Sequence, residues 1–458
     1  MTEHQNTIHP NENEILRDFE NRINNLPSIN SALYSKYGVK RGLRDISGQG
    51  VMAGLTEISK LSSYMLDENE YIPVPGKLFY RGIDIDEIVN AFLKENRHGF
   101  EETCFLLLFG ELPTLADLEQ YKSLQASYRS LPEGFVRDQM MKAPSNNIIN
   151  LMARSILTLY SYDADAEDNS LPNVLRQSLQ LIAQLPLLAA YGYQAYIHYF
   201  KNQSMIIHSP VPEYSTAENF LHMLRPDKKF SALEAKLLDL SLVLHAEHGG
   251  GNNSSFTTHV VTSTGTDTYS SVAASLGSLK GIKHGGASMM VTNMFADMKK
   301  EVKNWQNEDE VRQYLKKILN KEAFDGTGFI YGIGHAVYSL SDPRALQLKK
   351  QAKQLADSKG LTEEFQLYSL VERLAPEVIS SERRMYKGVS ANVDFYSGFV
   401  YQMLNLPPEL FTPIFAMARI VGWSAHRIEE LKHHGKVIRP GYMGVSPRRR
   451  YIELDKRK

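Results

Sequence analysis

The chain has 458 residues, enough to bury a large core, and this length alone predicts two or three domains. Its 51 lysines and arginines nearly balance its 52 aspartates and glutamates, so net charge favours neither a nucleic acid nor a membrane surface as partner. The single cysteine, Cys104, excludes an internal disulfide, and the apolar run around it predicts a buried, unreactive thiol.

No segment has the character of a targeting signal or a membrane span. Residues 1–14 are polar and partly acidic, unlike a secretory signal or an arginine-rich transit peptide. Later apolar stretches are broken by polar residues such as His198 and Arg419, which argues against a bilayer span. The basic tail after Ser446 is typical of a solvated terminus. We therefore expect a soluble cytoplasmic protein that binds neither membrane nor nucleic acid.

Helical patterns dominate the chain after a polar lead of about forty residues. The exception is the range 71–81, where Pro73 and Pro75 interrupt short apolar pieces and a β-hairpin is predicted. Thr114 followed by Asp117 predicts a helix N-terminus, because the two residues can cap each other's backbone N–H groups. The sequence therefore predicts a mostly α-helical fold.

Two further helices are predicted downstream. Ser231 and Glu234 repeat the capping pattern, and the leucines that follow form one apolar stripe: Leu233, Leu237, Leu240 and Leu244. Glycines 249–251 mark the end of this helix. The range 269–279 is built mainly from small side chains, which let another helix approach closely in the interior or at a subunit interface.

His284 follows Gly281 and precedes Gly285-Gly286, after which a new helix is predicted over 287–303. A histidine at a helix N-terminus feels the positive end of the helix dipole, which disfavours protonation. A neutral imidazole there can donate a hydrogen bond to a carbonyl oxygen. A histidine that only caps a glycine turn fits the same residues, so the pattern alone leaves both interpretations open.

His335 lies in a glycine-rich loop that misses the dinucleotide-binding fingerprint and follows no predicted strand. Such a loop can still hold a histidine in a tight turn against a ligand. Arg344 comes just after Pro343, at the predicted start of a helix. Its planar fork suits a carboxylate, although a surface arginine fits the same position.

Asp394 stands at the start of a helical run over 395–404. An ordinary N-cap aspartate explains this position, but a carboxylate there can also act as a general base on a substrate C–H group. The presence of His284, His335 and Arg344 in the same chain favours the second interpretation.

His245 and His248 are predicted to be neighbours on the helix that starts at Ser231, with His248 continuing the apolar stripe. A His-x-x-His pair can bind zinc, but no third ligand stands at a familiar spacing. We therefore expect histidines that donate to a substrate oxygen rather than a metal site.

Taken in order, these segments resemble the citrate synthase family from about Gly42 to Pro440. No single motif is specific, and the order and spacing over most of the chain carry the resemblance. The matching segments are Gly42-Leu43-Arg44-Asp45, Thr56-Glu57-Ile58-Ser59, Tyr80-Arg81-Gly82-Ile83-Asp84, Phe100-Glu101-Glu102, Phe109-Gly110-Glu111-Leu112-Pro113, His245-Ala246-Glu247-His248, His284-Gly285-Gly286-Ala287, Gly334-His335 with Tyr338, Asp342-Pro343-Arg344, Asn392-Val393-Asp394-Phe395, Ala418-Arg419 with Gly422-Trp423, and Arg439-Pro440.

The resemblance implies an all-α homodimer whose chains each have a large domain and a smaller, mobile domain that closes over the substrate. By position, residues 1–40 would form a polar lead and residues 286–397 the small domain. Residues 41–285 and 398–458 would together form the large, dimerising domain.

The resemblance also implies a reaction: oxaloacetate and acetyl-CoA condense to citryl-CoA, which is hydrolysed to citrate and CoA without a metal or redox cofactor. Asp394 would remove a proton from the acetyl methyl group. His284 would hydrogen-bond the thioester oxygen, and His335 would polarise the keto group and supply a proton. The implied substrate-binding residues are His248, Arg344, Arg419 and, from the neighbouring subunit, Arg439.

Some positions depart from the common family pattern. Ser288 stands where asparagine often follows the histidine motif, and Lys283 stands where many members have an apolar or small residue. Ala336 and Ser339 lack the basic side chains that some members carry there. The residues that bind the CoA phosphates therefore stay unassigned.

Two alternatives remain open at this point. A 2-methylcitrate synthase would run the same chemistry on propionyl-CoA, and one extra methylene is worth only about 1–3 kcal/mol in a pocket. A non-catalytic binder of acyl-CoA or carboxylates could share the fold, although the presence of every proton-transfer residue argues against it.

Overall fold

The computed structural model describes residues 12–44, 50–68, 70–335, 337–383, 388–433 and 435–457. Residues 1–11, Asp45 and Ala336, which enter the sequence analysis, lie outside the described residues. The contacts divide the chain into a terminal unit, Met1–Met52 with Arg439–Lys458, and a central unit, Ala53–Ile438. The division into a large and a small domain, with its predicted boundaries, stays a prediction.

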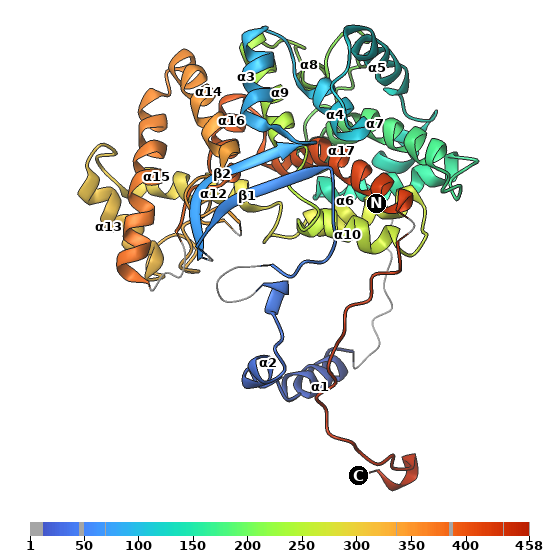
Figure 1. The fold of residues 1–458 in the computed structure, drawn as a ribbon, viewed down its shortest axis with the longest axis vertical. Helices are drawn as coiled ribbons and strands as arrows, with labels where there is room; N and C mark the ends of the chain where they lie inside the picture. The colour runs from blue at the N-terminus through green and yellow to red at the C-terminus, as the bar shows by residue number, and fades with distance from the viewer. Residues whose placement is uncertain are drawn as a thin grey trace. The chain divides into compact units, whose positions relative to one another are not determined.

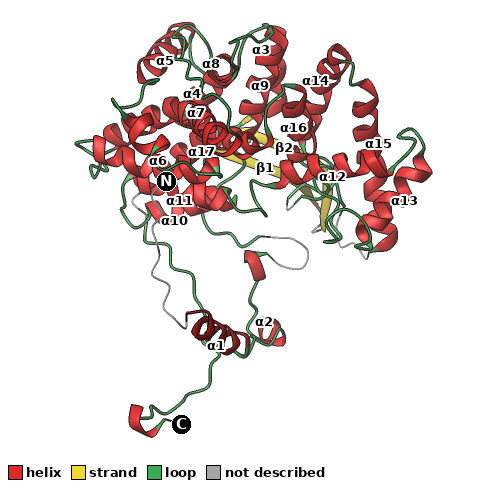
Figure 2. Cartoon of the chain, turned by 180° about the vertical axis from the view of Figure 1, so that it is seen from behind, coloured by secondary structure: helices red, strands yellow, loops and turns green. Residues whose placement is uncertain are grey.

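The prediction of an all-α fold is confirmed, since helices form most of the central unit (Figures 1 and 2). Its helices are α3 Ile85–Lys94, α4 Phe100–Phe109, α5 Leu115–Tyr128, η2 Val136–Met141, α6 Ile148–Leu159, η3 Tyr160–Tyr162, α7 Leu171–Lys201, α8 Thr216–Leu224, α9 Ala232–His245, α10 Asn253–Thr262, α11 Thr268–Leu279, α12 Ala287–Glu301, α13 Glu308–Leu319, α14 Pro343–Lys359, α15 Thr362–Glu382, α16 Val393–Met403, η4 Pro408–Leu410 and α17 Phe411–Lys432. The terminal unit holds α1 Glu12–Asn24, α2 Ala32–Lys36, η1 Arg41–Leu43 and η5 Leu454–Lys456. None of the helices in the described residues is long and apolar enough to cross a bilayer.

A small antiparallel sheet, in the order β1-β2-β3, is the only one in the described residues. Its strands are β1 Ser59–Asp67, β2 Glu70–Tyr80 and β3 Ile83–Asp84. The predicted hairpin range 71–81 is therefore wrong in extent, because these residues form a single strand whose partner precedes them. The register shifts between Ser62 and Tyr64, which faces Pro73. A proline that cannot donate to the ladder suits such an irregularity.

Helix N-termini follow the capping chemistry of the sequence. Thr114 with Asp117 and Ser231 with Glu234 form the predicted capping boxes, at α5 and α9. The amphipathic interpretation of α9 is wrong: its residues from Leu237 to His245 are buried on every side. Neighbouring helices α4, α8, α14, α16 and α17 pack around it.

The long helix α7 and helix α17 pack against each other in the core of the central unit. The small side chains of α11 allow a close approach to α10, as predicted: Thr258 Oγ1 lies 2.7 Å from Ser275 Oγ, between the two helices. Cys104 on α4 is buried, and burial raises the pKa of its thiol well above the usual range. The prediction of a buried, unreactive thiol is therefore confirmed.

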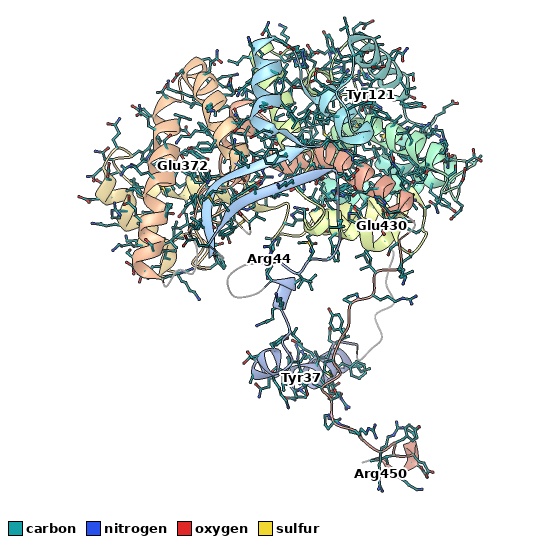
Figure 3. All side chains as sticks on the ribbon, in the orientation of Figure 1. Tyr37, Arg44, Tyr121, Glu372, Glu430 and Arg450 are labelled. Carbon is teal, nitrogen blue, oxygen red and sulfur yellow. The ribbon has the colours of Figure 1, made fainter. Side chains whose placement is uncertain are left out.

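Helices α12 to α16 gather at one end of the central unit in both views (Figures 1 and 2). Glu372 on α15 (Figure 3) accepts a hydrogen bond of 2.7 Å from the Tyr396 hydroxyl on α16 and pairs with Lys349 on α14. The Glu372 carboxylate thus links α15 to α14 and α16, and each of these two helices carries a predicted site residue in its first turn.

Candidate active site

Six of the seven predicted site residues lie in the central unit, each at or near the end of an element or on α17. His248 follows α9, His284 precedes α12, and His335 lies in the loop before α14. Arg344 and Asp394 lie in the first turns of α14 and α16, and Arg419 lies within α17. The seventh, Arg439, is exposed in the terminal unit, and its role stays a prediction.

Electrostatic interactions place the six residues in one environment. Burial lowers the pKa of His248 well below the usual range, and electrostatic interactions with four neighbours lower it further: Arg344, His335, Arg419 and His284. The charges of Arg344 and Arg419 also act on Asp394. Elements separated by up to 171 residues of sequence, from His248 to Arg419, thus meet around a common centre.

Arg419 carries the strongest sign of an anionic ligand. It is fully buried, its Nε donates to the carbonyl oxygen of His245 at 2.7 Å, and its guanidinium lies 4.7 Å from the ring of Phe415. Nη1 and Nη2 are buried and have no hydrogen-bond partner among the described residues. Burial lowers the pKa of Arg419 to about 10. Because a buried, unpaired donor is costly, a carboxylate that accepts from both nitrogens would be bound strongly.

Arg344 is held by Asp342, the N-cap of α14. Its Nε and Nη2 donate to the two carboxylate oxygens at 3.0 and 2.7 Å, and its backbone N–H also donates to Asp342. Burial alone would lower the pKa of Arg344, but the charge of Asp342 outweighs it, so this pKa is raised. The pair fixes the guanidinium plane, a role for Asp342 that the sequence pattern does not indicate.

His335 is oriented by the backbone of its own loop. Its Nδ1 accepts N–H hydrogen bonds from Val337 and Tyr338 at 2.9 and 3.0 Å, and its ring stacks on Tyr338 with centroids 4.7 Å apart. Since Nδ1 acts as an acceptor, the neutral ring carries its hydrogen on Nε2. Nε2 points toward Nη2 of Arg344, 3.4 Å away. The predicted loop thus presents a donor toward a carboxylate-binding group.

The β-hairpin supports this loop. The Tyr64 hydroxyl lies 2.8 Å from Ser339 Oγ, and the N–H of Gly76 donates to the carbonyl oxygen of Ser341 at 3.2 Å. A Cβ atom at Gly76 would overlap that oxygen and the ring of Tyr338. Only glycine fits this close approach between β2 and the loop.

His284 is neutral, as predicted, but for a different reason. Burial, followed by the charge of Arg419, lowers its pKa to about 4, so the helix dipole is not the main cause. Its Nε2 lies 3.1 Å from Ser254 Oγ, which also accepts from Trp423 Nε1 and donates to Asn252 Oδ1. A hydroxyl has one hydrogen, so Ser254 can donate either to Asn252 or to Nε2 of His284. If it donates to Nε2, that nitrogen is an acceptor and the ring hydrogen of His284 lies on Nδ1. Ser254 was not found from the sequence, where no motif marks it.

Asp394 is not the N-cap of its helix. Asn392 fills that position and accepts the N–H of Asp394 at 3.0 Å, which leaves the Asp394 carboxylate available for another task. Burial and the charge of Asp342 raise its pKa to about 6, against the opposing charges of Arg344 and Arg419. A carboxylate with a raised pKa is a stronger base, which suits proton abstraction near neutral pH.

His245 and His248 differ from their predicted setting, because α9 ends at His245 and His248 lies beyond it. Both rings are buried. Both ring nitrogens of His245 and Nε2 of His248 lack hydrogen-bond partners among the described residues. His245, which lies 4.5 Å from the ring of Phe415, is therefore a further candidate for ligand contact.

Comparisons with known proteins show which family this chain resembles. A family model described as "Citrate synthase, C-terminal domain" matches residues 43–441. A citrate synthase of Synechocystis sp. is 36% identical over 80% of this chain and 84% of its own. A 2-methylcitrate synthase of Shewanella oneidensis is 33% identical over 81% of this chain and 90% of its own.

Among solved structures, the citrate synthase of Pyrobaculum aerophilum superposes with a TM-score of 0.71 at 28% identity. The match covers 89% of this chain and 94% of that one. The family model, the relatives and this structure together show that the chain belongs to the citrate synthase family.

Proposed function

We propose that this chain condenses acetyl-CoA with oxaloacetate and water to give citrate and CoA. The observation that carries the proposal is Arg419, whose two buried Nη atoms lack a partner beside His248, Arg344 and Asp394. A small dicarboxylate with a reactive keto group satisfies these donors. The neighbouring carboxylate and histidines then supply the proton transfers.

The chemistry begins at the acetyl methyl group. Asp394 takes a proton from the methyl carbon, while His284 donates a hydrogen bond to the thioester oxygen, so that the charge developing on this oxygen becomes enol-like rather than that of a free enolate. Since the pKa of His284 is about 4, its ring is neutral at physiological pH and acts as a hydrogen-bond donor. For this role its hydrogen must lie on Nδ1, which requires the Ser254 hydroxyl to donate to Nε2 of His284 rather than to Oδ1 of Asn252.

The enol carbon then forms a bond to the keto carbon of oxaloacetate. His335 gives the Nε2 hydrogen to the keto oxygen, which becomes the hydroxyl group of citryl-CoA. Arg344 and Arg419 bind the carboxylates through charge-assisted hydrogen bonds of about 1.5–3 kcal/mol each. Water finally cleaves the thioester, which releases citrate and CoA. No residue in this sequence of steps requires a metal or a redox cofactor.

The direct test is CoA release followed with a thiol reagent. The single cysteine is buried, so the folded protein contributes little thiol signal of its own. We expect release from acetyl-CoA only when oxaloacetate is present. Pure, folded protein that binds oxaloacetate but releases no CoA would instead be a non-catalytic binder, and the proposal would be wrong.

A second candidate is a 2-methylcitrate synthase, favoured by the relative of that name at 33% identity. It uses propionyl-CoA in the same steps. Because one methylene changes binding by only about 1–3 kcal/mol, the discrimination between the thioesters is about 10–200-fold at most. Comparison of kcat/KM for acetyl-CoA and propionyl-CoA at saturating oxaloacetate decides between the two functions.

We further propose a homodimer in which Arg439 binds the substrate of the neighbouring subunit. Arg439→Ala and Asp394→Asn would each inactivate the dimer. In a refolded equal mixture, half of the dimers are mixed, and one of their two sites has both intact residues. Activity should then return to about a quarter of the wild-type level. An inactive mixture, with mixed dimers verified by mass spectrometry, would place Arg439 in its own chain's site. An active Arg439→Ala dimer would place it in no site.

A further inference from the structure

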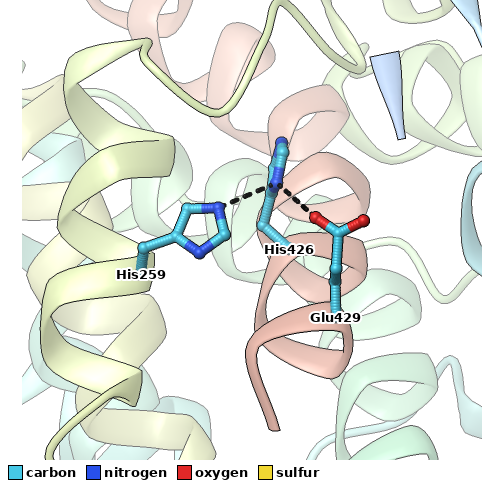
Figure 4. A group of neighbouring side chains, drawn as sticks. All are labelled: His259, His426 and Glu429. Atoms are coloured by element: carbon cyan, nitrogen blue, oxygen red, sulfur yellow. Dashed lines mark hydrogen bonds and ion pairs between the residues drawn. The ribbon is translucent and has the colours of Figure 1, made fainter. Parts of the chain in front are cut away.

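A second group of titratable side chains lies between α10 and α17, outside the proposed catalytic set (Figure 4). His259 comes from α10, and His426 and Glu429 come from α17. Nε2 of His259 lies 3.1 Å from Nδ1 of His426, which lies 3.9 Å from Oε2 of Glu429. His426 and Glu429 are buried, and His259 is partly buried. No other three potential metal ligands of the His, Cys, Asp and Glu type meet in the described part of the chain.

In each imidazole, one nitrogen faces the other ring (the inner nitrogen) and one points away from it (the outer nitrogen). Each outer nitrogen already has a carboxylate partner. Nδ1 of His259 lies 2.8 Å from Oε2 of Glu430, which Figure 3 shows at the end of α17. Nε2 of His426 lies 3.0 Å from Oε1 of Glu247. An ionised carboxylate only accepts, so both outer nitrogens carry hydrogens.

The two inner nitrogens therefore face each other with their lone pairs when both rings are neutral. At 3.1 Å, two lone pairs repel unless a proton or a cation lies between them. The arrangement therefore requires a positive charge between the two nitrogens, either a proton or a metal cation. The surroundings of Glu429 distinguish these two possibilities.

Glu429 presents a third unsatisfied acceptor to the same space. Its Oε1 accepts the N–H of Glu57 at 2.8 Å, whereas its Oε2 is buried and has no hydrogen-bond partner among the described residues. A proton shared by the two rings would leave this oxygen unpaired, at the cost of a buried acceptor without a donor. A cation held by both nitrogens and by Oε2 satisfies all three atoms.

We propose that His259, His426 and Glu429 form a binding site for a divalent transition metal ion of the zinc type. Two imidazoles and a carboxylate are a donor set that zinc accepts, and carboxylates behind the imidazoles are the usual outer partners of zinc-bound histidines. Zinc binds nitrogen and oxygen at about 2.0–2.2 Å, so two ligands of one ion are at most about 4.4 Å apart. The three atoms lie within 4.8 Å of one another, and a small rotation of the Glu429 side chain closes the set.

Water supplies the remaining coordination position. Glu429 also lines a cavity of about 430 Å³ together with Glu57 and Arg81. The cavity reaches the cluster at Glu429, and neither imidazole lines it. The negative charges of Glu247, Glu429 and Glu430 around the site balance the charge of a divalent cation.

The metal would act on the active site through the segment that carries His248. Glu247, which His426 holds, also accepts hydrogen bonds from Ser59 Oγ at 2.8 Å and from the N–H of Gly249. An ideal Cβ at Gly250 would lie 3.3 Å from the ring of His426 and 3.4 Å from Nε2 of His259, so this segment packs on both imidazoles. The ion is therefore a structural one that fixes the loop beside His248, and it does not touch reacting atoms.

The test uses the full chain, stripped with a chelator and titrated with Zn²⁺ by calorimetry and with Co²⁺ by visible absorption. We expect one ion per chain at the site. His259→Gln and Glu429→Gln should each weaken binding at least ten-fold, and Glu430→Gln should weaken it about 10–100-fold by releasing the outer partner of His259. His208→Gln is the matched control. The side chain of this half-buried histidine hydrogen-bonds the carbonyl oxygen of Pro226, far in sequence from the cluster.

A thermal scan gives a readout that does not depend on turnover. Zn²⁺ should raise the unfolding midpoint of the wild type and of His208→Gln, but not that of His259→Gln. Thermal scans of each variant without metal report any folding defect separately. The Glu430→Gln substitution lies at the rim of the site and leaves the three ligands in place. Absence of stoichiometric binding, or equally tight binding in His259→Gln or Glu429→Gln, would overturn the proposal in favour of a proton shared by the two rings.

Discussion

Nη2 of Arg344 lies 3.4 Å from Nε2 of His335, and both atoms present hydrogens to the same space. The guanidinium can only donate, and the two backbone bonds to Nδ1 of His335 leave its hydrogen on Nε2. An oxygen placed between them accepts from both. A 2-oxo acid suits this arrangement, because its carboxylate can bind Arg344 while its adjacent keto oxygen faces His335.

Asp342 should be essential for the orientation of Arg344. In Asp342→Asn the buried guanidinium loses its countercharge, and the free energy of unfolding should fall by about 3–5 kcal/mol. Urea unfolding measures this change. The control is Asp357→Asn, whose exposed pair with Lys353 should contribute little to stability. Similar losses in both variants would contradict the role of Asp342.

Asp394→Asn should reduce kcat by about 10²–10⁴-fold, because the amide cannot take the methyl proton. Oxaloacetate affinity should stay nearly unchanged, since this side chain acts on the thioester substrate. Steady-state CoA release and calorimetric binding of oxaloacetate measure the two quantities. Wild-type turnover in this variant would remove Asp394 from the mechanism.

The pH profile should identify the base. Asp394 with a pKa of about 6 is protonated in acid, so kcat/KM should fall as the pH drops through about 6. His284, with a pKa of about 4, keeps its neutral form over this range. The residual activity of Asp394→Asn should lack this fall of kcat/KM at acidic pH, the acid limb of the profile. If the limb persists there, another group titrates.

The same carboxylate should make the fold less stable at neutral pH. Its pKa of about 6 in the folded protein lies above the ordinary value of 3.8, so its favourable contribution is complete below about pH 4 and is lost as the pH rises through about 6. Asp394→Asn should therefore be more stable than the wild type at pH 7.5, by about 1–3 kcal/mol. Urea unfolding at pH 4 and pH 7.5 measures the difference. A gain of equal size at both pH values would argue against this cause.

Two buried arginines of α17 offer a matched comparison. Arg419 has two unpaired Nη atoms, whereas Arg427 donates to Asn169, Thr262, Thr266 and Thr268. Arg419→Lys should weaken oxaloacetate binding about 10–100-fold with little loss of stability. Arg427→Lys should lower stability and leave the affinity unchanged. Calorimetry and urea unfolding separate the two effects, and the reverse pattern would exclude Arg419 from substrate binding.

Local chemistry made part of this structure predictable. Capping residues such as Thr114 and Ser231 act within one helical turn, so their helices start where the sequence indicates. The N-termini of α14 and α16, which position Arg344 and Asp394, are capped in the same way by Asp342 and Asn392. The order of the family motifs supplied the rest of the candidate site.

Features that depend on distant partners could not be read from the sequence. The burial of α9 on all sides comes from helices that pack around it, which leucine spacing does not report. Ser254 reaches His284 across 30 residues, and His259 meets His426 across 167. The absence of a third ligand at a familiar spacing therefore says nothing about a cluster assembled from two helices.

Gly76 lies on β2, more than 250 residues before the loop that carries His335, yet it touches the backbone of that loop. Any bulkier residue there would displace the loop while leaving every reacting side chain present. In a random mutagenesis screen for loss of CoA release, such variants would be recovered alongside those of the proton-transfer residues. A second-site suppressor should then arise among residues 338–341, where space can be regained.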